Sequence, residues 1–293
     1  MTNKAVFALM VVITTSLMGS SFAVGKIGLS YVSPLLLVGI RFTLAGLLMI
    51  AIVTALKRPH PKRFTDWLRI FWIGAFQTAG VMGAIFLSLR TITAGESAIL
   101  TFMNPLLVVV LGTLALRIRY RFVQWAGVLL GFIGVVVTMG TELQLEIGTF
   151  FGFSSAVFWA VATLLIKKWG ARFDIWVLTA YQMLFGGILL LLGSALLEEA
   201  KLILNPASVS IIVWLAVMAS IVQFAIWFYL LQKGNPGKVS AFLFLAPFFG
   251  VISGWWLLGE ELGLTLLLGG SLIFIGIFLV NWPDKAAKTP IAE

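Results

Sequence analysis

The sequence predicts an all-α integral membrane protein in which ten transmembrane helices form two inverted five-helix repeats. Three observations support this fold class. The 293 residues are 61% hydrophobic and 11% charged, whereas soluble domains carry about 25% charged residues. Ten apolar runs are long enough to cross the hydrocarbon core of a bilayer, which needs about 20 residues. The two halves of the chain also resemble each other at a nearly fixed offset.

The N-terminal half supplies five of these runs. The first begins after one lysine and is longer than the apolar core of a typical signal peptide, so no cleavable signal is expected. Lys26 closes this run, and Ala94-Gly95 opens the fourth. The five expected helices are Ala5–Gly25, Pro34–Leu56, Leu68–Leu89, Ala94–Leu116 and Phe122–Gly140.

The C-terminal half supplies five more runs in a matching order. Lys167 closes the sixth run as Lys26 closes the first, and Pro236-Gly237 opens the ninth as Ala94-Gly95 opens the fourth. The connectors are short, so residues 1–293 form a single transmembrane domain. The expected helices are Gly148–Ile166, Ile175–Leu197, Val209–Leu231, Pro236–Leu258 and Leu262–Asn281.

The basic residues are sorted by side of the membrane. The two termini and the connectors after the second, fourth, sixth and eighth helices hold 16 of the 20 Lys and Arg residues, and the other connectors hold 3. Because cytoplasmic loops are enriched in Lys and Arg, both termini are expected to be cytoplasmic in a multi-pass protein of the cell (inner) membrane. This sorting explains the net charge of +9 without a nucleic-acid partner. The expected partners are the lipid bilayer and a small-molecule substrate.

The internal repeat is visible in matched positions of the two halves. Asn104-Pro105 matches Ala246-Pro247 in mid-span, and the glycines of the fifth and tenth helices match as well. One repeat covers about 1–140 and the other about 146–283. Because each repeat has an odd number of helices, the second enters the membrane from the opposite side. Inverted repeats are typical of secondary transporters that bind their substrate near the midplane.

Several motifs occur in a characteristic order and spacing. They are Met18–Lys26 (MGSSFAVGK), Arg41-Phe42, Ala98/Leu100/Pro105, Ala241/Leu243/Pro247, Leu258–Leu262 (LGEEL) and Gly269–Leu279 (GGSLIFIGIFL). Together they resemble the drug/metabolite transporter (DMT) superfamily in its ten-span EamA branch, over nearly the whole chain. More narrowly, the chain resembles the YddG-type exporters of aromatic amino acids. The resemblance implies export of amino acids or related metabolites from the cytoplasm. One departure is that Arg117-Ile118-Arg119 follows the fourth helix, where the family usually has an acid.

The candidate substrate-binding residues are polar or aromatic side chains inside the predicted helices. Gln77, Thr78 and Gln223 lie near mid-membrane, where they either bind a zwitterionic amino acid or bond neighbouring helices. Thr101 and Asn104 lie one turn apart, just before a proline. Aromatic side chains deep in a span either line a substrate cavity or pack against lipid and core. The aromatic candidates are Phe22, Trp159, Tyr181 and Trp227.

One charge lies inside a predicted helix. Arg41 is roughly 12 Å from the outer face at 1.5 Å per residue, and an unpaired charge at such depth is costly. It either binds a substrate carboxylate or bonds helix carbonyls and snorkels. No carboxylate is expected at mid-depth, so the sequence predicts facilitated export or very weak proton coupling.

Matched prolines and nearby glycines are candidate hinges. An interior proline removes a helix hydrogen bond, so Pro105 and Pro247 predict either gating kinks or static ones. Gly250 and Gly254 follow Pro247 at helical spacing and would permit bending or close packing.

Other protein classes lack support in the composition. There are no cysteines and one histidine, His60, so no metal site or thiol chemistry is expected, and no cofactor motif is present. An intramembrane enzyme would need a nucleophile with a base, so the chain is predicted not to be an enzyme. The remaining alternatives are a multidrug or other metabolite efflux carrier of the same fold, and a channel. A monomer suffices, because both repeats lie in one chain.

Overall fold

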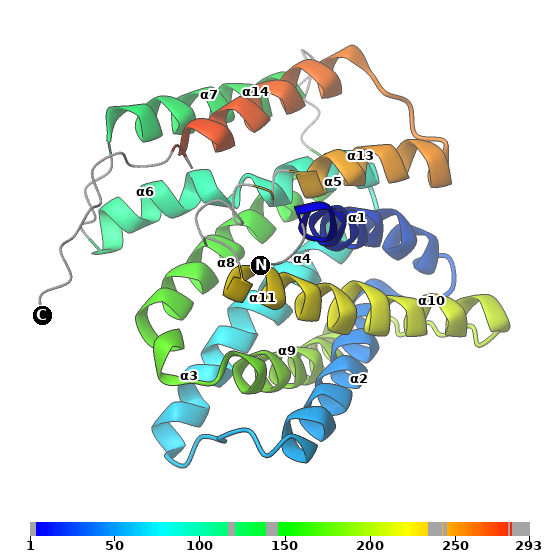
Figure 1. Ribbon diagram of the computed structural model, residues 1–293. Helices are drawn as coiled ribbons and strands as arrows, with labels where there is room; N and C mark the ends of the chain where they lie inside the picture. Colours follow the sequence, from blue (N-terminus) through cyan, green and yellow to red (C-terminus); the bar gives the residue numbers. More distant parts are fainter. Residues whose placement is uncertain are drawn as a thin grey trace, which may run out of the picture.

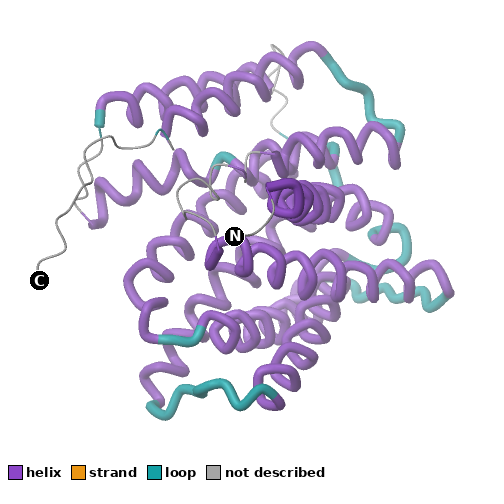
Figure 2. The backbone as a smooth tube through the Cα atoms, viewed as in Figure 1, coloured by secondary structure: helices purple, strands orange, loops and turns teal. Residues whose placement is uncertain are grey.

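Every predicted span that falls within the described residues is built from helix. The computed structural model (Figure 1) describes residues 4–116, 121–138, 146–233, 242, 245–280 and 282. In these ranges, helices are joined by short connections, and extended pairing is limited to an isolated bridge between Val32 and Leu202 (Figure 2).

The helices of the N-terminal half follow the predicted apolar runs. Seven apolar helices in the described residues are long enough to cross a membrane, and four of them lie in this half. A shorter apolar helix, α7, follows them. The elements are α1 (Lys4–Gly28), α2 (Pro34–Ala55), α3 (Phe64–Gly74), η1 (Ala75–Gly80), α4 (Val81–Ser88), α5 (Ala94–Phe102), α6 (Asn104–Leu116) and α7 (Phe122–Thr138).

The C-terminal half follows the same pattern. It contributes three long spans, and two shorter apolar helices, α13 and α14, correspond to the ninth and tenth runs. The elements are α8 (Ile147–Trp169), η2 (Gly170–Arg172), α9 (Ile175–Leu197), α10 (Pro206–Ala216), η3 (Val217–Val222), α11 (Gln223–Lys233), α13 (Leu245–Leu258) and α14 (Leu264–Val280). Some predicted ends and motif residues lie outside the described residues: Arg117, Arg119, Gly140, Pro236, Ala241, Leu243 and Asn281.

Three spans are interrupted, which hydropathy alone does not predict. The third span contains the π-helix η1 between α3 and α4, and the eighth contains the π-helix η3 between α10 and α11. Their first residues, Ala75 and Val217, are equivalent positions of the sequence repeat. The fourth span breaks at Met103, where α5 ends and α6 begins, next to Pro105. Since π-helical turns cluster at functional sites, the matched pair draws attention to the space between these spans.

Helices α2 and α9 meet along a seam without intervening side chains. A Cβ atom placed on Gly46 would lie 2.6 Å from the backbone nitrogen of Leu184, and one on Gly187 would lie 2.5 Å from that of Thr43. Because the later residue of α2 faces the earlier residue of α9, the two helices run antiparallel. Their backbones therefore approach more closely than any residue with a side chain would allow.

Helices α7 and α14 form a second seam of the same kind, and Figure 1 shows them side by side along one edge of the bundle. A Cβ atom on Gly127 would lie 2.6 Å from the carbonyl oxygen of Gly276. One on Gly134 would lie 2.7 Å from that of Gly269. These helices also run antiparallel. Each seam thus joins helices that are equivalent in the sequence repeat, the second with the seventh span and the fifth with the tenth.

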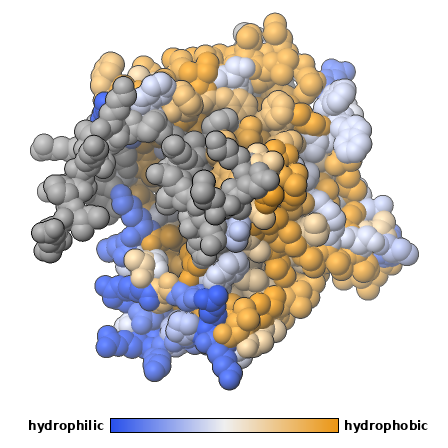
Figure 3. Space-filling model, in the orientation of Figure 1, coloured by the Kyte–Doolittle hydropathy of each residue, from blue (hydrophilic) through white to orange (hydrophobic). Residues whose placement is uncertain are grey.

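The surface has an apolar belt, and its basic residues gather at one end. Hydrophobic residues cover most of the face in Figure 3, and hydrophilic residues gather where the α2–α3 connection and the α8–α9 turn lie in Figure 1. Basic residues are exposed in both connections: Lys57, Arg58, Lys62, Arg63, Lys167, Lys168 and Arg172. An apolar belt with one basic end is the surface expected of a membrane protein.

Candidate substrate cavity

A cavity of about 330 Å³ lies inside the bundle, and helices from both halves of the chain line it. The first four predicted spans contribute, and so do the sixth, seventh and eighth. Six of the nine predicted substrate-binding residues line this cavity, as does Arg41: Phe22, Gln77, Thr101, Trp159, Gln223 and Trp227. Their role in binding stays a prediction.

Arg41 reaches across the bundle to the π-helix of the eighth span. Its Nε donates to Ser220 Oγ at 3.0 Å, and its Nη2 donates to the carbonyl oxygen of Ala219 at 2.8 Å. The residue is 3% exposed, and its guanidinium lies 4.7 Å from the ring centroid of Phe42. Both hydrogen-bond acceptors are neutral. The structure therefore shows the carbonyl bonding expected of a structural arginine and also places the charge at the cavity.

A neutral pair occupies the matching position in the other half. Thr78 Oγ1, in η1, donates to Gln182 Oε1 at 2.6 Å. Gln182 matches Arg41 in the repeat as Lys167 matches Lys26, and Ser220 matches Thr78 as Ala246 matches Asn104. Arg41 of α2 thus bonds a hydroxyl in the π-helix of the C-terminal half, and Gln182 of α9 bonds one in the π-helix of the N-terminal half. The first bond involves a charged side chain and the second does not.

Two donors at the cavity have spare capacity. Gln223 is 3% exposed, and its buried Nε2 has no hydrogen-bond partner among the described residues. Arg41 carries five N–H groups, of which two are engaged in the part of the chain that the structure describes. An unsatisfied buried donor costs about 1–3 kcal/mol, so both groups favour a ligand that accepts hydrogen bonds.

Aromatic and aliphatic side chains form the rest of the wall. The ring of Phe102 lies 5.3 Å from that of Trp159 and 6.1 Å from that of Phe22, measured between centroids. Phe86 and Trp227 also line the cavity. These separations are typical of edge-to-face and tilted aromatic contacts, so the wall can accept another ring.

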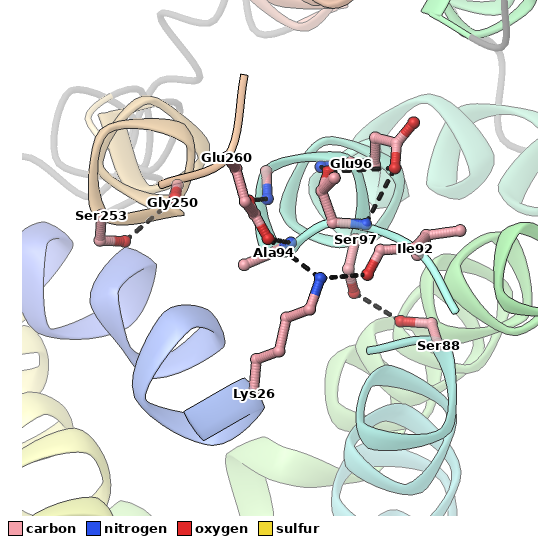
Figure 4. A network of polar contacts seen from close by, with 11 residues as sticks. Lys26, Ser88, Ile92, Ala94, Glu96, Ser97, Gly250, Ser253 and Glu260 are labelled. Atoms are coloured by element: carbon pink, nitrogen blue, oxygen red, sulfur yellow. Dashed lines mark hydrogen bonds and ion pairs between the residues drawn. The ribbon is translucent and has the colours of Figure 1, made fainter. Parts of the chain in front are cut away.

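A polar network closes one end of the bundle (Figure 4). Lys26 extends from the end of α1 and donates to Glu260 Oε1 at 3.0 Å and to the carbonyl oxygen of Ile92 at 2.9 Å. Glu260 also accepts from the backbone N–H groups of Ala94 at 2.7 Å and Gly95 at 3.2 Å. The carboxylate therefore caps the positive N-terminus of α5 while it pairs with a lysine of α1.

Gly254 leaves the space that Glu260 occupies. A Cβ atom on Gly254 would collide with Glu260 Oε2. Gly250 lies one turn earlier in α13, where a Cβ atom would lie 2.6 Å from that of Ala98. Both glycines thus permit close packing of α13 against α5, and their role as hinges stays a prediction.

A second carboxylate serves α2 at the same end. Glu198, after α9, accepts from the N–H groups of Leu35 and Leu36 at 3.2 and 2.9 Å. Ser194 Oγ donates to the same carboxylate at 2.8 Å. Loop carboxylates therefore fix the first turns of α2 and α5, each from the other half of the chain.

The opposite end of the bundle is basic and carries the one histidine of the sequence. Tyr181 points there and not into the cavity: its hydroxyl lies 3.2 Å from His60 Nδ1, and its ring packs edge-on against Trp67 at 4.6 Å. Arg58 pairs with Asp174 at 3.4 Å. The cavity wall reaches toward this end through Ile166 and Ile175.

Two further predicted residues lie beside the cavity and not in its wall. Thr78 is buried and donates a hydrogen bond to Gln182, and Gln182 lines the cavity. Asn104 begins α6 one turn beyond Thr101, whose hydroxyl lies 2.7 Å from Ser155 Oγ.

Pro247 is buried in the first turn of α13 as described, where a missing N–H removes no helix bond.

Sequence reasoning missed Gln182 and Phe102, both of which line the cavity. The repeat could have found Gln182, because it occupies the position that matches Arg41. Phe102 is one of 24 phenylalanines, and no pattern separates it from those that face lipid.

A bundle of apolar helices that encloses a cavity between its two halves is the arrangement expected of a membrane transporter. The sequence model of the EamA-like transporter family matches residues 6–140 and again 146–282. The chain therefore belongs to the EamA-like transporter family, part of the DMT superfamily, and is a multi-pass membrane protein. This is a family of transporters and not of enzymes.

Relatives extend over nearly the full length. "Uncharacterized transporter YvbV" of Bacillus subtilis is 30% identical over 96% of this chain and 93% of its own. "Probable amino-acid metabolite efflux pump" of Salmonella typhimurium is 27% identical over 92% and 93%. A crystal structure with 23% identity covers 94% of this chain and 96% of its own, with a TM-score of 0.66, which supports the fold.

Proposed function

We propose that the chain is a secondary transporter that exports amino acids, aromatic ones foremost, or related small metabolites by alternating access. The observation that carries this proposal is the cavity, which both halves line and which combines an arginine and the unpaired amide donor of Gln223 with an aromatic wall. The amino-acid assignment also draws on the name of the Salmonella relative.

The mechanism needs two inverted five-helix repeats within one ten-span monomer. The double family match supports the duplication. Two matched antiparallel seams support the inversion, because equivalent helices of an inverted pair run in opposite directions. The exchanged hydrogen bonds Arg41–Ser220 and Thr78–Gln182 fit the same pseudo-twofold relation.

The orientation follows from the basic connectors. In this orientation the protein lies in the cell (inner) membrane with both termini in the cytoplasm. The Lys26–Glu260 network then lies at the outer face. The cavity wall then reaches toward the cytoplasm through Ile166 and Ile175. This arrangement suits loading from inside, with the outer network broken in the release step.

A multidrug or other metabolite efflux carrier of the same fold is the second candidate. The apolar and aromatic wall favours it, because stacking and area burial discriminate little among bulky solutes. The polar residues Arg41 and Gln223 favour the first candidate, because a carboxylate satisfies both.

Transport into proteoliposomes separates the two candidates. The panel is phenylalanine, tyrosine, tryptophan, threonine and a cationic drug without a carboxylate. We expect saturable transport of at least one aromatic amino acid, and lower transport when Gln77 or Trp227 is changed to alanine. Trp256→Ala is the matched control, because Trp256 is exposed on the lipid-facing surface. Transport of the drug alone would favour the second candidate.

A topology experiment tests the inversion itself. Reporter tags placed after residue 140 and after residue 285 should report opposite sides of the membrane, because five helices separate them. The same compartment for both tags would remove the inverted repeat and the alternating-access mechanism with it.

A further inference from the structure

The charge of the cavity wall is unbalanced. Arg41 is the one charged side chain among the described residues that line the cavity, and no Asp or Glu lies among them. Its two hydrogen bonds go to the neutral groups of Ser220 and Ala219, and its half-repeat equivalent is the uncharged Gln182. An unloaded cavity therefore carries about one positive charge in a low-dielectric setting, where it is poorly screened.

The hydrogen-bonding capacity is unbalanced in the same direction. Arg41 has donors in excess of its two acceptors, and the Nε2 group of Gln223 is a buried donor without a partner among the described residues. The amide carbonyl of Gln182, by contrast, is already taken by Thr78. The other polar side chains of the wall, among them Gln77, are neutral and can both donate and accept, so the charge and the unpaired donor together suit an anion.

The remaining wall suits a ring. Phe22, Phe102 and Trp159 form a continuous aromatic contact beside the cavity. A solute that fits both parts has a planar apolar body and one carboxylate.

We infer that the preferred cargo is an apolar, best an aromatic, monocarboxylate anion, and that a zwitterionic amino acid of the same shape is a weaker substrate. This inference rests on the proposed transport function and names its substrate class. An anion brings the loaded cavity to zero net charge. A zwitterion leaves it at plus one and brings an ammonium group that meets no carboxylate on the described wall.

The same charge balance assigns an energy source. When a monoanion moves with no counter-ion on the protein, each cycle carries one negative charge across the membrane. The interior-negative potential of a cell then drives export directly. This account needs no titratable carboxylate in the cavity, which agrees with the composition of the described wall.

Three compounds that share a phenyl ring on a two-carbon linker, and differ in whether it carries a carboxylate, an ammonium or both, test the inference on the purified full chain. They are 3-phenylpropionate, phenylalanine and 2-phenylethylamine, which carry charges of minus one, zero and plus one. Binding is followed by tryptophan fluorescence, since Trp159 and Trp227 line the cavity. We expect the anion to bind at least about tenfold more tightly than phenylalanine, because phenylalanine also brings an ammonium group that is desolvated without a carboxylate partner, and a cost of about 1.4 kcal/mol is already tenfold.

Transport is measured as current from proteoliposomes on a solid support. The anion should give a protein-dependent current of negative charge, and phenylalanine should give none. Leakage of the neutral acid through lipid carries no charge and does not interfere. With a potassium gradient and valinomycin, each tenfold gradient should drive up to about tenfold accumulation of the anion.

Variants of one residue localise the effect. Arg41→Gln should abolish the preference for the anion, and Arg41→Lys should retain part of it, because it keeps the charge but not the fork of donors. Arg90→Gln removes a charge from an exposed connector and should change nothing. Because the three compounds are compared on the unaltered protein, that part of the test does not depend on whether a variant folds.

Phenylalanine binding as tight as that of the anion, or anion transport without current, would overturn the inference and leave the proposed transport function standing. If none of the three compounds crosses the membrane, the proposed export of aromatic solutes fails as well.

Discussion

The network around Glu260 allows a quantitative prediction for its end of the bundle, which the proposed orientation places at the outer face. Glu260→Gln removes the charge that pairs with Lys26 and that caps α5 through Ala94 and Gly95. The side chain is 11% exposed and that of Lys26 is 29% exposed, so solvent screens the pair only in part. The variant should destabilise the closed outer end relative to an open one.

The magnitude follows from the contacts. Loss of charge assistance on two backbone hydrogen bonds costs about 1 kcal/mol each, and the partly exposed lysine pair contributes about 1 kcal/mol more. The sum, about 3 kcal/mol, corresponds to about a 100-fold shift toward an open outer end, provided that the contacts break on opening.

Accessibility to a thiol reagent measures this shift. The chain has no cysteine, so Met82→Cys introduces a single thiol in the cavity wall. We expect a membrane-impermeant maleimide added outside intact cells to label it up to about 100-fold faster when Glu260→Gln is also present. Glu199→Gln, at an exposed glutamate of the same end, is the control. An unchanged rate, or an equal rise in the control, would refute the reasoning.

Three further predictions concern packing and the cavity wall. Gly187→Ala should lower the thermal midpoint in detergent by several degrees, because its Cβ would lie 2.5 Å from Thr43 N, while Gly193→Ala, 3.6 Å from Leu35 Cδ1, should not. Thr78→Val should destabilise the fold by about 1–3 kcal/mol, because it leaves Gln182 Oε1 unpaired. Thr78→Ser keeps the hydroxyl and should have the stability of the unaltered protein; equal denaturation midpoints for the unaltered protein and both variants would contradict this. Trp159→Ala should raise the KM for an aromatic substrate about tenfold through lost ring contact, whereas Trp256→Ala should leave it unchanged.

Hydropathy predicted where the helices lie, because a span needs a continuous apolar run whatever its neighbours are. The seventh span was predicted with the bounds of α9, Ile175–Leu197, and the fourth with the outer bounds of α5 and α6, Ala94 and Leu116. Where other described ends differ from the prediction, they differ by a few residues. The π-helices η1 and η3 were not predicted, because a π-turn depends on the tertiary contacts around it and leaves no simple sequence pattern.

The cavity was predicted less completely, because depth in a span does not determine which way a side chain faces. Tyr181 and Gln182 are adjacent in α9, about 100° apart around the helix. Tyr181 faces Trp67, whereas Gln182 faces the cavity. Arg41 was found because a charge inside a span is rare. The sequence repeat then points to Gln182, which occupies the matching position.

The backbone seams between α2 and α9 and between α7 and α14 restrict how the molecule can move. Where main chains touch, no layer of side chains remains to re-pack, so sliding by even a fraction of an ångström meets hard atoms. The two helices of each seam are therefore expected to keep their relative position while the protein changes conformation. Any rocking that alternates access must be taken up at other contacts, such as that of α5 with α8, where the rings of Phe102 and Trp159 and the hydroxyls of Thr101 and Ser155 can change partners.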